Sequence, residues 1–319
     1  MSHDEPDQSA PAVSVILPAF NAANTIASAI QSVREQTFGD WELIVVDDGS
    51  SDETWTIVSD LTAERENERA IRLEQNQGLA AARNTAIAAA RGEWIALLDA
   101  DDTWTPEKLD RCMTFLDEHP HLRVVYTPMA PVREDGTAMA GHSKPCHAGW
   151  LGEKLFLSIF VHDPAAVFHR DVIEEVGGFD ESLRVSIGHE FWLRVSTTFE
   201  FGLINEPLAL RGWSETSLTR SKRARSNRYK VRVLERFYFE RGGKDVVPRE
   251  KAMKRLAKVN YHAGKALLAE GKRAAALPYL RKALRYRPTY LRVWGYLIRA
   301  KLGAWLLGGG EPAEPLNVP

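Results

Sequence analysis

Acidic side chains gather in two short segments of this sequence, each directly after a hydrophobic run. Asp99, Asp101 and Asp102 end the segment LLDADD, and Asp47 and Asp48 end ELIVVDD. Carboxylates next to a buried strand are costly unless they bind cations or hydrogen-bond donors. Mg²⁺ and Mn²⁺ take oxygen ligands and usually complete their shell with water and substrate phosphates, so one or two carboxylates suffice. The segment LLDADD therefore predicts a site for Mn²⁺ or Mg²⁺.

Each of these segments also has a purely structural explanation. Asp102 precedes Thr-Trp-Thr-Pro and could help to start a helix. Asp47 and Asp48 could form a turn with the glycine that follows, or accept hydrogen bonds from a nucleotide base or ribose. Gly78 and Arg83, in NQGLAAARN, lie where a loop enters a helix, which suits a phosphate or carboxylate partner.

The elements that must position these residues follow an alternating β and α pattern. We expect strands at 13–17, 42–47, 71–74, 94–99 and 124–127, and helices at about 24–35, from Asp52, at 79–90 and after Pro106. Parallel strands joined by crossover helices give this order, so the fold class is α/β. Ligands of such sheets bind beyond the carboxyl ends of the strands, where the polar segments converge.

Several segments in a fixed order point to one family. These are VSVILPAFNAANTIASAIQSV, WELIVVDDGSSDET and NQGLAAARNTAIAAARGEWIALLDADD, followed by VFHRDVIEEVGGFDESL and EFWLRV. Together they resemble the family-two glycosyltransferases over residues 13–219, and the combination is far more specific than any single motif. The resemblance implies a GT-A fold, a Rossmann-like nucleotide-diphospho-sugar transferase domain. It also implies an inverting transfer from a nucleotide-diphosphate sugar, with UDP as the expected nucleotide, to a hydroxyl of a glycan or lipid-linked acceptor in cell-envelope polysaccharide synthesis.

The resemblance assigns roles to individual residues. It places ten residues against the nucleotide sugar: Pro18, Ala19, Phe20, Asn21, Asp47, Asp48, Gly78, Arg83, Asp99 and Ala100. Asp99 and Asp101 would form a DxD-like metal site, with Asp101 as the direct ligand and Asp102 as a second one. The metal would neutralise the leaving diphosphate, which lowers the barrier by stabilising the charge that develops there.

The expected general base is where the sequence departs from the family. Relatives usually carry a Glu-Asp pair shortly before the WLR stretch, and its Asp is the base, but this chain has Ile187 and Gly188. A shift of one residue would bring His189 to that place, and imidazole is competent near neutral pH. Glu190 is the other candidate, although a carboxylate in the first turn of a helix is favourable for structural reasons alone.

A second departure follows Arg211, where relatives often have a histidine near the metal or diphosphate. Trp213 stands in that neighbourhood and could stack on a sugar or base, or pack in the core. His142, His147 and His162 lack the spacing of a metal site, so we expect them in loops or near the acceptor.

The sequence divides into a flexible tail (1–12), the GT-A domain (13–220) and a basic helical module (221–319). Residues 1–219 carry 36 Asp and Glu against 16 Lys and Arg, whereas residues 220–301 carry 25 Lys and Arg against 5 Asp and Glu. The module contains one tetratricopeptide-like helix pair (257–288) and an amphipathic C-terminal stretch that charged residues interrupt too often for a membrane span. Its charge predicts either an anionic partner, such as a membrane surface, through 221–301, or docking onto the acidic domain.

Composition and the absence of certain motifs indicate where the protein is located and which other functions are not expected. The first residues lack an apolar signal segment, and only two cysteines occur, so we expect a cytoplasmic protein that could lie against the inner face of the membrane. Nucleic-acid binding is not expected, because the front of the chain is acidic and no recognition motif occurs. A nucleotidyltransferase would need a Gly-rich phosphate loop, which LPAFNAANT is not. A catalytically silent sugar-nucleotide-binding or scaffold protein remains the alternative.

Overall fold

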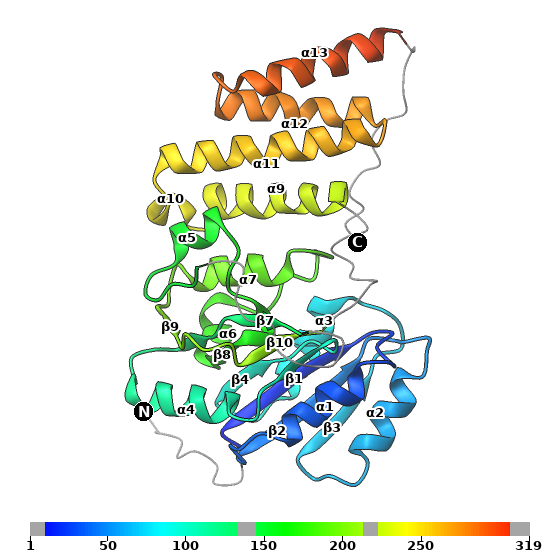
Figure 1. The fold of residues 1–319 in the computed structure, drawn as a ribbon, viewed down its shortest axis with the longest axis vertical. Coiled ribbons are helices and arrows are strands. Elements are labelled where there is room, and N and C mark those ends of the chain that lie inside the picture. Colours follow the sequence, from blue (N-terminus) through cyan, green and yellow to red (C-terminus); the bar gives the residue numbers. More distant parts are fainter. Residues whose placement is uncertain (1–9, 133–144, 213–222, 307–319) are drawn as a thin grey trace. The chain divides into compact units, whose positions relative to one another are not determined.

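The computed structural model describes residues 10–132, 145–212 and 223–306 (Figure 1). The chain divides into two compact units. The first is built from residues 1–151 and 159–214, and the second from residues 152–158 and 215–319. The first unit is a mixed α/β structure and the second is helical, as the sequence predicts for the fold class.

The core of the first unit is a seven-stranded sheet in the order β3-β2-β1-β4-β8-β6-β9. Its strands are β1 (Val13–Ala19), β2 (Trp41–Asp47), β3 (Glu68–Arg72), β4 (Trp94–Leu97), β6 (Val124–Tyr126), β8 (Ala166–His169) and β9 (Phe201–Leu203). Strands β3, β2, β1 and β4 run parallel, while β8 is antiparallel to both β4 and β6. The chain adds β2 and β3 on one side of β1 and then β4 on the other, so the strand order reverses at β1 and β4. Ligands of open α/β sheets bind at such a reversal.

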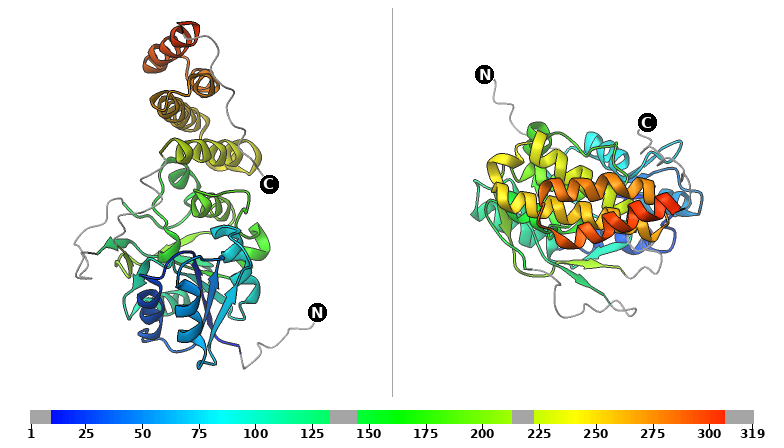
Figure 2. Two further views of the ribbon diagram at one scale, coloured as in Figure 1. Left: turned by 90° about the vertical axis from the view of Figure 1, so that its right-hand side faces the viewer. Right: turned by 90° about the horizontal axis from the view of Figure 1, so that it is seen from above.

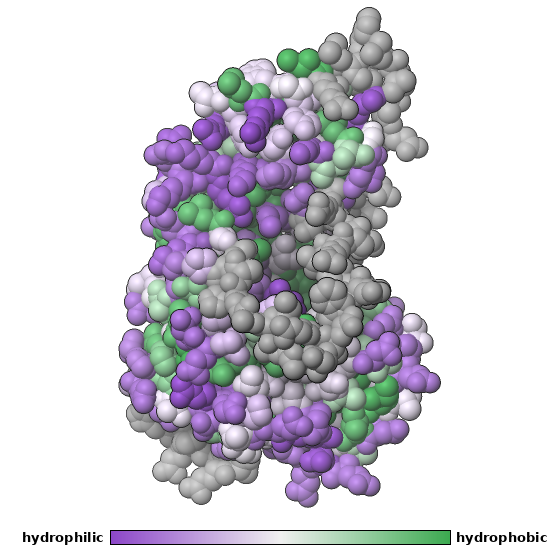
Figure 3. Space-filling model, viewed as in Figure 1, coloured by the Kyte–Doolittle hydropathy of each residue, from purple (hydrophilic) through white to green (hydrophobic). Residues whose placement is uncertain are grey.

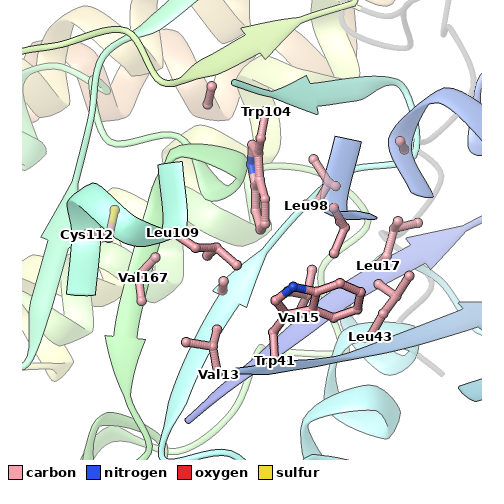
Figure 4. Packing of buried hydrophobic residues seen from close by; sticks show 14 of the residues in the cluster. Val13, Val15, Leu17, Trp41, Leu43, Leu98, Trp104, Leu109, Cys112 and Val167 are labelled. Atoms are coloured by element: carbon pink, nitrogen blue, oxygen red, sulfur yellow. The ribbon is translucent and has the colours of Figure 1, made fainter. Parts of the chain in front are cut away.

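Alternating residues of β1 and β2 form the main core. Val13, Val15 and Leu17 share one face of β1, because successive side chains of a strand point to opposite faces. They pack with apolar residues of α1 (Ile26–Arg34), α2 (Thr54–Thr62) and α4 (Lys108–Glu118), as Figure 4 shows for Leu109. The strands that carry the polar segments are therefore fixed by buried packing.

The remaining elements of the first unit lie after β2 in the chain. They are α3 (Leu79–Ala89), α6 (Asp171–Val176), α7 (Ile187–Val195), the short 3₁₀ helix η1 (Asp163–Ala165), and a small sheet of β5 (Asp102–Trp104), β10 (Ala209–Arg211) and β7 (Met129–Pro131). The sequence does not predict this small sheet, and it places the third strand at 71–74 where the structure has Glu68–Arg72. β3 is an edge strand with several exposed side chains, so its hydrophobic pattern is weak.

The second unit consists of helices. They are α5 (Gly152–Leu157), α9 (Arg223–Glu240), α10 (Gly243–Val246), α11 (Arg249–Ala269), α12 (Arg273–Tyr286) and α13 (Leu291–Leu306). Helices α9, α11, α12 and α13 pack on one another in chain order (Figure 2). Gly271, with a φ of 77°, forms the turn between α11 and α12, where positive φ favours glycine. Within the described ranges, no helix has the length and hydrophobicity needed to cross a bilayer.

Candidate functional site

The turns after β1 and β2 are locked together at the carboxyl edge of the sheet. Asn21 adopts a positive φ of 50°, its backbone N–H donates to Ser50 Oγ (2.9 Å), and its Oδ1 accepts from Ser51 N (2.9 Å). Phe20, between Ala19 and this turn, is 47% exposed. An exposed aromatic ring on a braced turn is available to stack on a planar ligand.

The two aspartates after β2 hold the backbone around them. Asp48 accepts hydrogen bonds from Gln77 N (2.7 Å), Gly78 N (2.8 Å) and Asn76 Nδ2 (3.0 Å). Burial raises the pKa of its carboxyl despite these donors. Asp47 is fully buried and pairs with Arg72 (Nε–Oδ2 3.4 Å). Both carboxylates thus fix the loops at the carboxyl edge, including the loop that leads into α3.

Arg83 lies at the centre of a buried ionic cluster. Its side chain is fully buried, and its two terminal nitrogens each bind one carboxylate, Asp99 Oδ1 and Asp163 Oδ2, both at 2.6 Å. The centre of the Phe179 ring lies 5.1 Å from Cζ of the guanidinium. Burial alone would lower the pKa of Arg83, but Asp163 and Asp99 outweigh it and raise that pKa, so the group stays charged. Arg83 therefore links the end of β4 to η1.

The three aspartates after β4 have different surroundings. The Asp99 side chain is 30% exposed, and Asp101 is exposed with no hydrogen bond or ion pair to its carboxylate from the described residues. Asp102 is buried and accepts from Gly212 N (3.1 Å), and burial, together with Asp99 and Asp101, raises its carboxyl pKa well above the ordinary value. Ala100 is buried between them.

The protein alone does not offer a complete metal shell there. Over residues 10–132, 145–212 and 223–306, no three His, Cys, Asp or Glu side chains converge on a common point that could hold an ion. Asp101 and the exposed part of Asp99 nevertheless fit a hard divalent ion that keeps waters and takes its other ligands from a substrate diphosphate. Asp102 fits less well, because it is buried and already accepts a backbone hydrogen bond.

The two candidates for the base lie on the first turn of α7, and both are buried. Both carboxylate oxygens of Glu190 bind Arg194, at 2.9 Å and 3.0 Å. Arg194 in turn donates to the carbonyl groups of Val176, Gly177 and Gly178. Through Arg194, Glu190 thus connects α7 to the turn after α6 and stabilises the local fold.

Two polar residues near the site carry no recognisable motif in the sequence. Asp163 accepts from Trp192 Nε1 (2.7 Å) in addition to Arg83, and Arg184 donates to the carbonyl oxygen of Gln77 in the loop before α3. Only the fold brings them to this edge. Two of the histidines that the sequence places in loops or near the acceptor are described. The backbone carbonyl of His147 accepts a hydrogen bond from Tyr126 Oη (2.7 Å), and His162 immediately precedes η1. His142 and Trp213 lie outside the described residues.

A comparison with protein families identifies the first unit. The model of the family described as Glycosyl transferase family 2 matches residues 14–177, slightly more than half of the chain. The chain belongs to this family. The match covers the turns after β1 and β2, Arg83 and the aspartates after β4, whereas α7 lies beyond it.

Curated relatives point in the same direction. The chain is 37% identical over 129 residues to the putative teichuronic acid biosynthesis glycosyltransferase TuaG of Bacillus subtilis (40% of this chain, 51% of TuaG). It is 29% identical over 225 residues to chondroitin synthase of Escherichia coli (69% of this chain, 32% of the synthase). It also matches an uncharacterised protein, y4gI of Sinorhizobium fredii, at 32% identity (59% of this chain). The chain spans between about one fifth and one half of the length of these relatives.

Solved structures share the fold of this family-2 glycosyltransferase. Residues 1–349 of S. aureus TarS in complex with UDP-GlcNAc superpose with a TM-score of 0.66 at 19% identity, covering 94% of this chain and 93% of that one. The mannosyltransferase PcManGT from Pyrobaculum calidifontis, in complex with GDP-Man and Mn²⁺, gives 0.54 at 20% identity, covering 96% and 90%. Both comparisons extend beyond the α/β unit into the helices and support the GT-A fold.

Proposed function

We propose that this protein transfers a sugar, with inversion, from a UDP-linked donor to a hydroxyl group of a glycan or lipid-linked glycan of the cell envelope. The observation that carries the proposal is the group of Phe20, Asp99 and Asp101 at the point where the strand order of the sheet reverses. Family membership supports a glycosyl transfer, and the TarS complex with UDP-GlcNAc supports a UDP-linked donor. The relatives TuaG and chondroitin synthase support a polysaccharide acceptor.

The residues divide the work according to their surroundings. The exposed ring of Phe20 would stack on the nucleotide base, while Asp47 and Asp48 keep the neighbouring turns in place. Asp101, with Asp99 beside it, would hold Mn²⁺ or Mg²⁺ against the donor diphosphate. When bound, such an ion supplies positive charge that stabilises the leaving diphosphate. Arg83 keeps the Asp99 carboxylate in place through a 2.6 Å ion pair.

Donor binding provides a direct test of this function. A ligand that binds only the folded state must stabilise it, by about 2.7 kcal/mol at a hundredfold excess over Kd. We expect the melting temperature to rise with a UDP-sugar plus Mn²⁺ or Mg²⁺, and to rise much less with EDTA or with GDP-, dTDP- or CMP-sugars. Turnover of the same UDP-sugar then separates an enzyme from a silent scaffold. A folded protein that responds to no nucleotide sugar would contradict the proposal.

A second proposal concerns the helical unit, for which we infer peripheral attachment to an anionic membrane surface. Residues 271–310 contain nine Lys and Arg and no Asp or Glu. Leu291, Trp294 and Ile298 are exposed on α13. Their spacing of three and four residues puts them on one side of the helix. In Figure 3, hydrophobic patches interrupt the hydrophilic surface of this unit. Apolar and aromatic side chains among basic residues are typical of helices that lie in the membrane interface.

Vesicle flotation tests the membrane proposal. We expect the protein to float with phosphatidylglycerol-containing vesicles at low salt, not with neutral ones, because each basic residue near an anionic surface contributes about 1 kcal/mol. Trp294→Glu should reduce flotation about tenfold or more. Ala274→Glu, which adds the same charge at an exposed position of α12, should reduce it far less. Equal flotation of both variants would show that the exposed side of α13 does not contact the membrane, and no flotation of the wild type would contradict the membrane proposal.

A further inference from the structure

The carboxylate of Asp163 occupies the space where a side chain at position 188 would begin. A Cβ atom built on Gly188 would overlap both carboxylate oxygens of Asp163. Asp163 begins η1, and the strand after η1, β8, runs antiparallel to β4 with Val167 opposite Ala96. This pairing brings Asp163 to the end of β4 that carries Asp99. A carboxylate is therefore present beside the first turn of α7, although α7 itself does not supply it.

The surroundings of Asp163 leave it able to accept a further hydrogen bond. Its Oδ2 binds Arg83 and its Oδ1 accepts from Trp192 Nε1, at 2.6 Å and 2.7 Å. A carboxylate offers about four acceptor positions, so these two bonds orient it without saturating it. Its side chain is 15% exposed, which leaves part of the group open to a ligand.

The alternative carboxylate on α7 is committed elsewhere. Both oxygens of Glu190 are held by Arg194, and Arg194 is anchored by three backbone carbonyl groups. A group that accepts a proton must come within hydrogen-bond reach of the hydroxyl that gives it up. Moving Glu190 to a substrate would break this anchor. Asp163 needs no such movement, because it already lies next to the Arg83–Asp99 pair.

We propose that Asp163 is the catalytic carboxylate that accepts the proton of the acceptor hydroxyl, an inference that rests on the proposed transferase function. The acceptor O–H bond breaks and its proton passes to Asp163. The acceptor oxygen forms a bond to the anomeric carbon of the sugar, while the bond between that carbon and the diphosphate oxygen breaks and its electron pair leaves with the diphosphate. Gly188 is the position at which the family resemblance places a base. In this chain η1 supplies a carboxylate beside that position, and glycine leaves room for it. Arg83 is a positioning residue that aligns Asp163 with Asp99.

The test is to remove the Asp163 carboxylate and then to introduce a carboxylate on α7, at position 188. We expect Asp163→Asn, which keeps the size of the side chain, to lower kcat on the order of 10²–10⁴-fold, the usual contribution of general base catalysis. The Kd of the donor, measured by titration of the UDP-sugar, should change little, because the base acts on the acceptor. The melting temperature should fall by no more than a few degrees, because Asp99 still pairs with Arg83. The double variant Asp163→Ala with Gly188→Asp should have a kcat at least tenfold higher than that of Asp163→Ala alone. Asp163→Ala with Gly188→Ala is the matched control and should recover none.

The outcomes separate this inference from the proposed function. If the wild type binds a donor and turns it over, and folded Asp163→Asn stays within about threefold of its kcat, Asp163 is not the base. If Asp163→Asn instead loses donor binding, and the Gly188→Asp combination restores no activity, Asp163 only holds Arg83 and the inference is overturned. A wild type without any turnover would instead contradict the proposed function itself. Donor titration of that same sample would show whether the protein still binds the nucleotide sugar.

Discussion

Replacing Arg83 by Met is expected to lower the free energy of unfolding by about 3–5 kcal/mol, the usual cost of removing one partner from a buried ionic group. Met fills a similar volume, so the loss is mainly electrostatic. Without the guanidinium, Asp99 and Asp163 would share a largely buried site with no positive charge between them. Since folded domains are stable by only about 5–15 kcal/mol, the variant would be close to the limit of folding.

Denaturant unfolding followed by circular dichroism measures this effect. Arg111→Met is the matched control, because Arg111 pairs with Glu206 at the same 2.6 Å distance but both side chains are half exposed. Exposed pairs contribute about 0–1 kcal/mol, so the control should be nearly neutral. Arg83→Lys should fall between the two, since an ammonium keeps the charge but cannot span both carboxylates as a planar guanidinium does. Equal stabilities of the Arg83→Met and Arg111→Met variants would show that the buried cluster does not hold the unit together.

The central strands could be predicted because burial on both faces leaves a continuous hydrophobic run. β1, β2 and β4 have this pattern, and each is followed by polar residues that break it. The sequence places the third strand two to three residues too late, because an edge strand with exposed side chains gives no such run. The small sheet was not predicted because its strands of three residues come from distant parts of the chain. Such pairings depend on the whole fold and leave no local periodicity.

The candidate site shows the same division between local and long-range information. LLDADD and the paired turns after β1 and β2 are local, so their residue types indicate their position. The partnership of Arg83 with Asp163 spans 80 residues and depends on the insertion of β8 next to β4. The family resemblance places Arg83 against the donor, and that role stays a prediction; the structure shows its side chain buried between two carboxylates. Residue type alone does not distinguish a buried arginine from a ligand-binding one.

A large effect on activity is also expected from Asp101. Its carboxylate is exposed and no bond from the described residues holds it, so Asp101→Asn should leave the free energy of unfolding almost unchanged. The substitution removes one negative charge from the proposed ion site. We expect the metal-dependent rise in melting temperature with a UDP-sugar to disappear, and kcat/KM to fall on the order of 10²–10³-fold, as when one group that stabilises transition-state charge is removed.

The control for this prediction is another exposed aspartate of the same unit. Asp60 lies on the exposed side of α2, in the half of that helix remote from the turn at its start, so Asp60→Asn changes the net charge equally without touching the site. It should retain both the metal-dependent shift and the activity. Excess Mn²⁺ should recover part of the activity of Asp101→Asn, because a weakened site is refilled by mass action. If Asp101→Asn and Asp60→Asn behave alike, Asp101 does not hold the ion. Asp99, which Arg83 already orients, would then be the residue to replace next, because its carboxylate is partly exposed and lies two residues before Asp101.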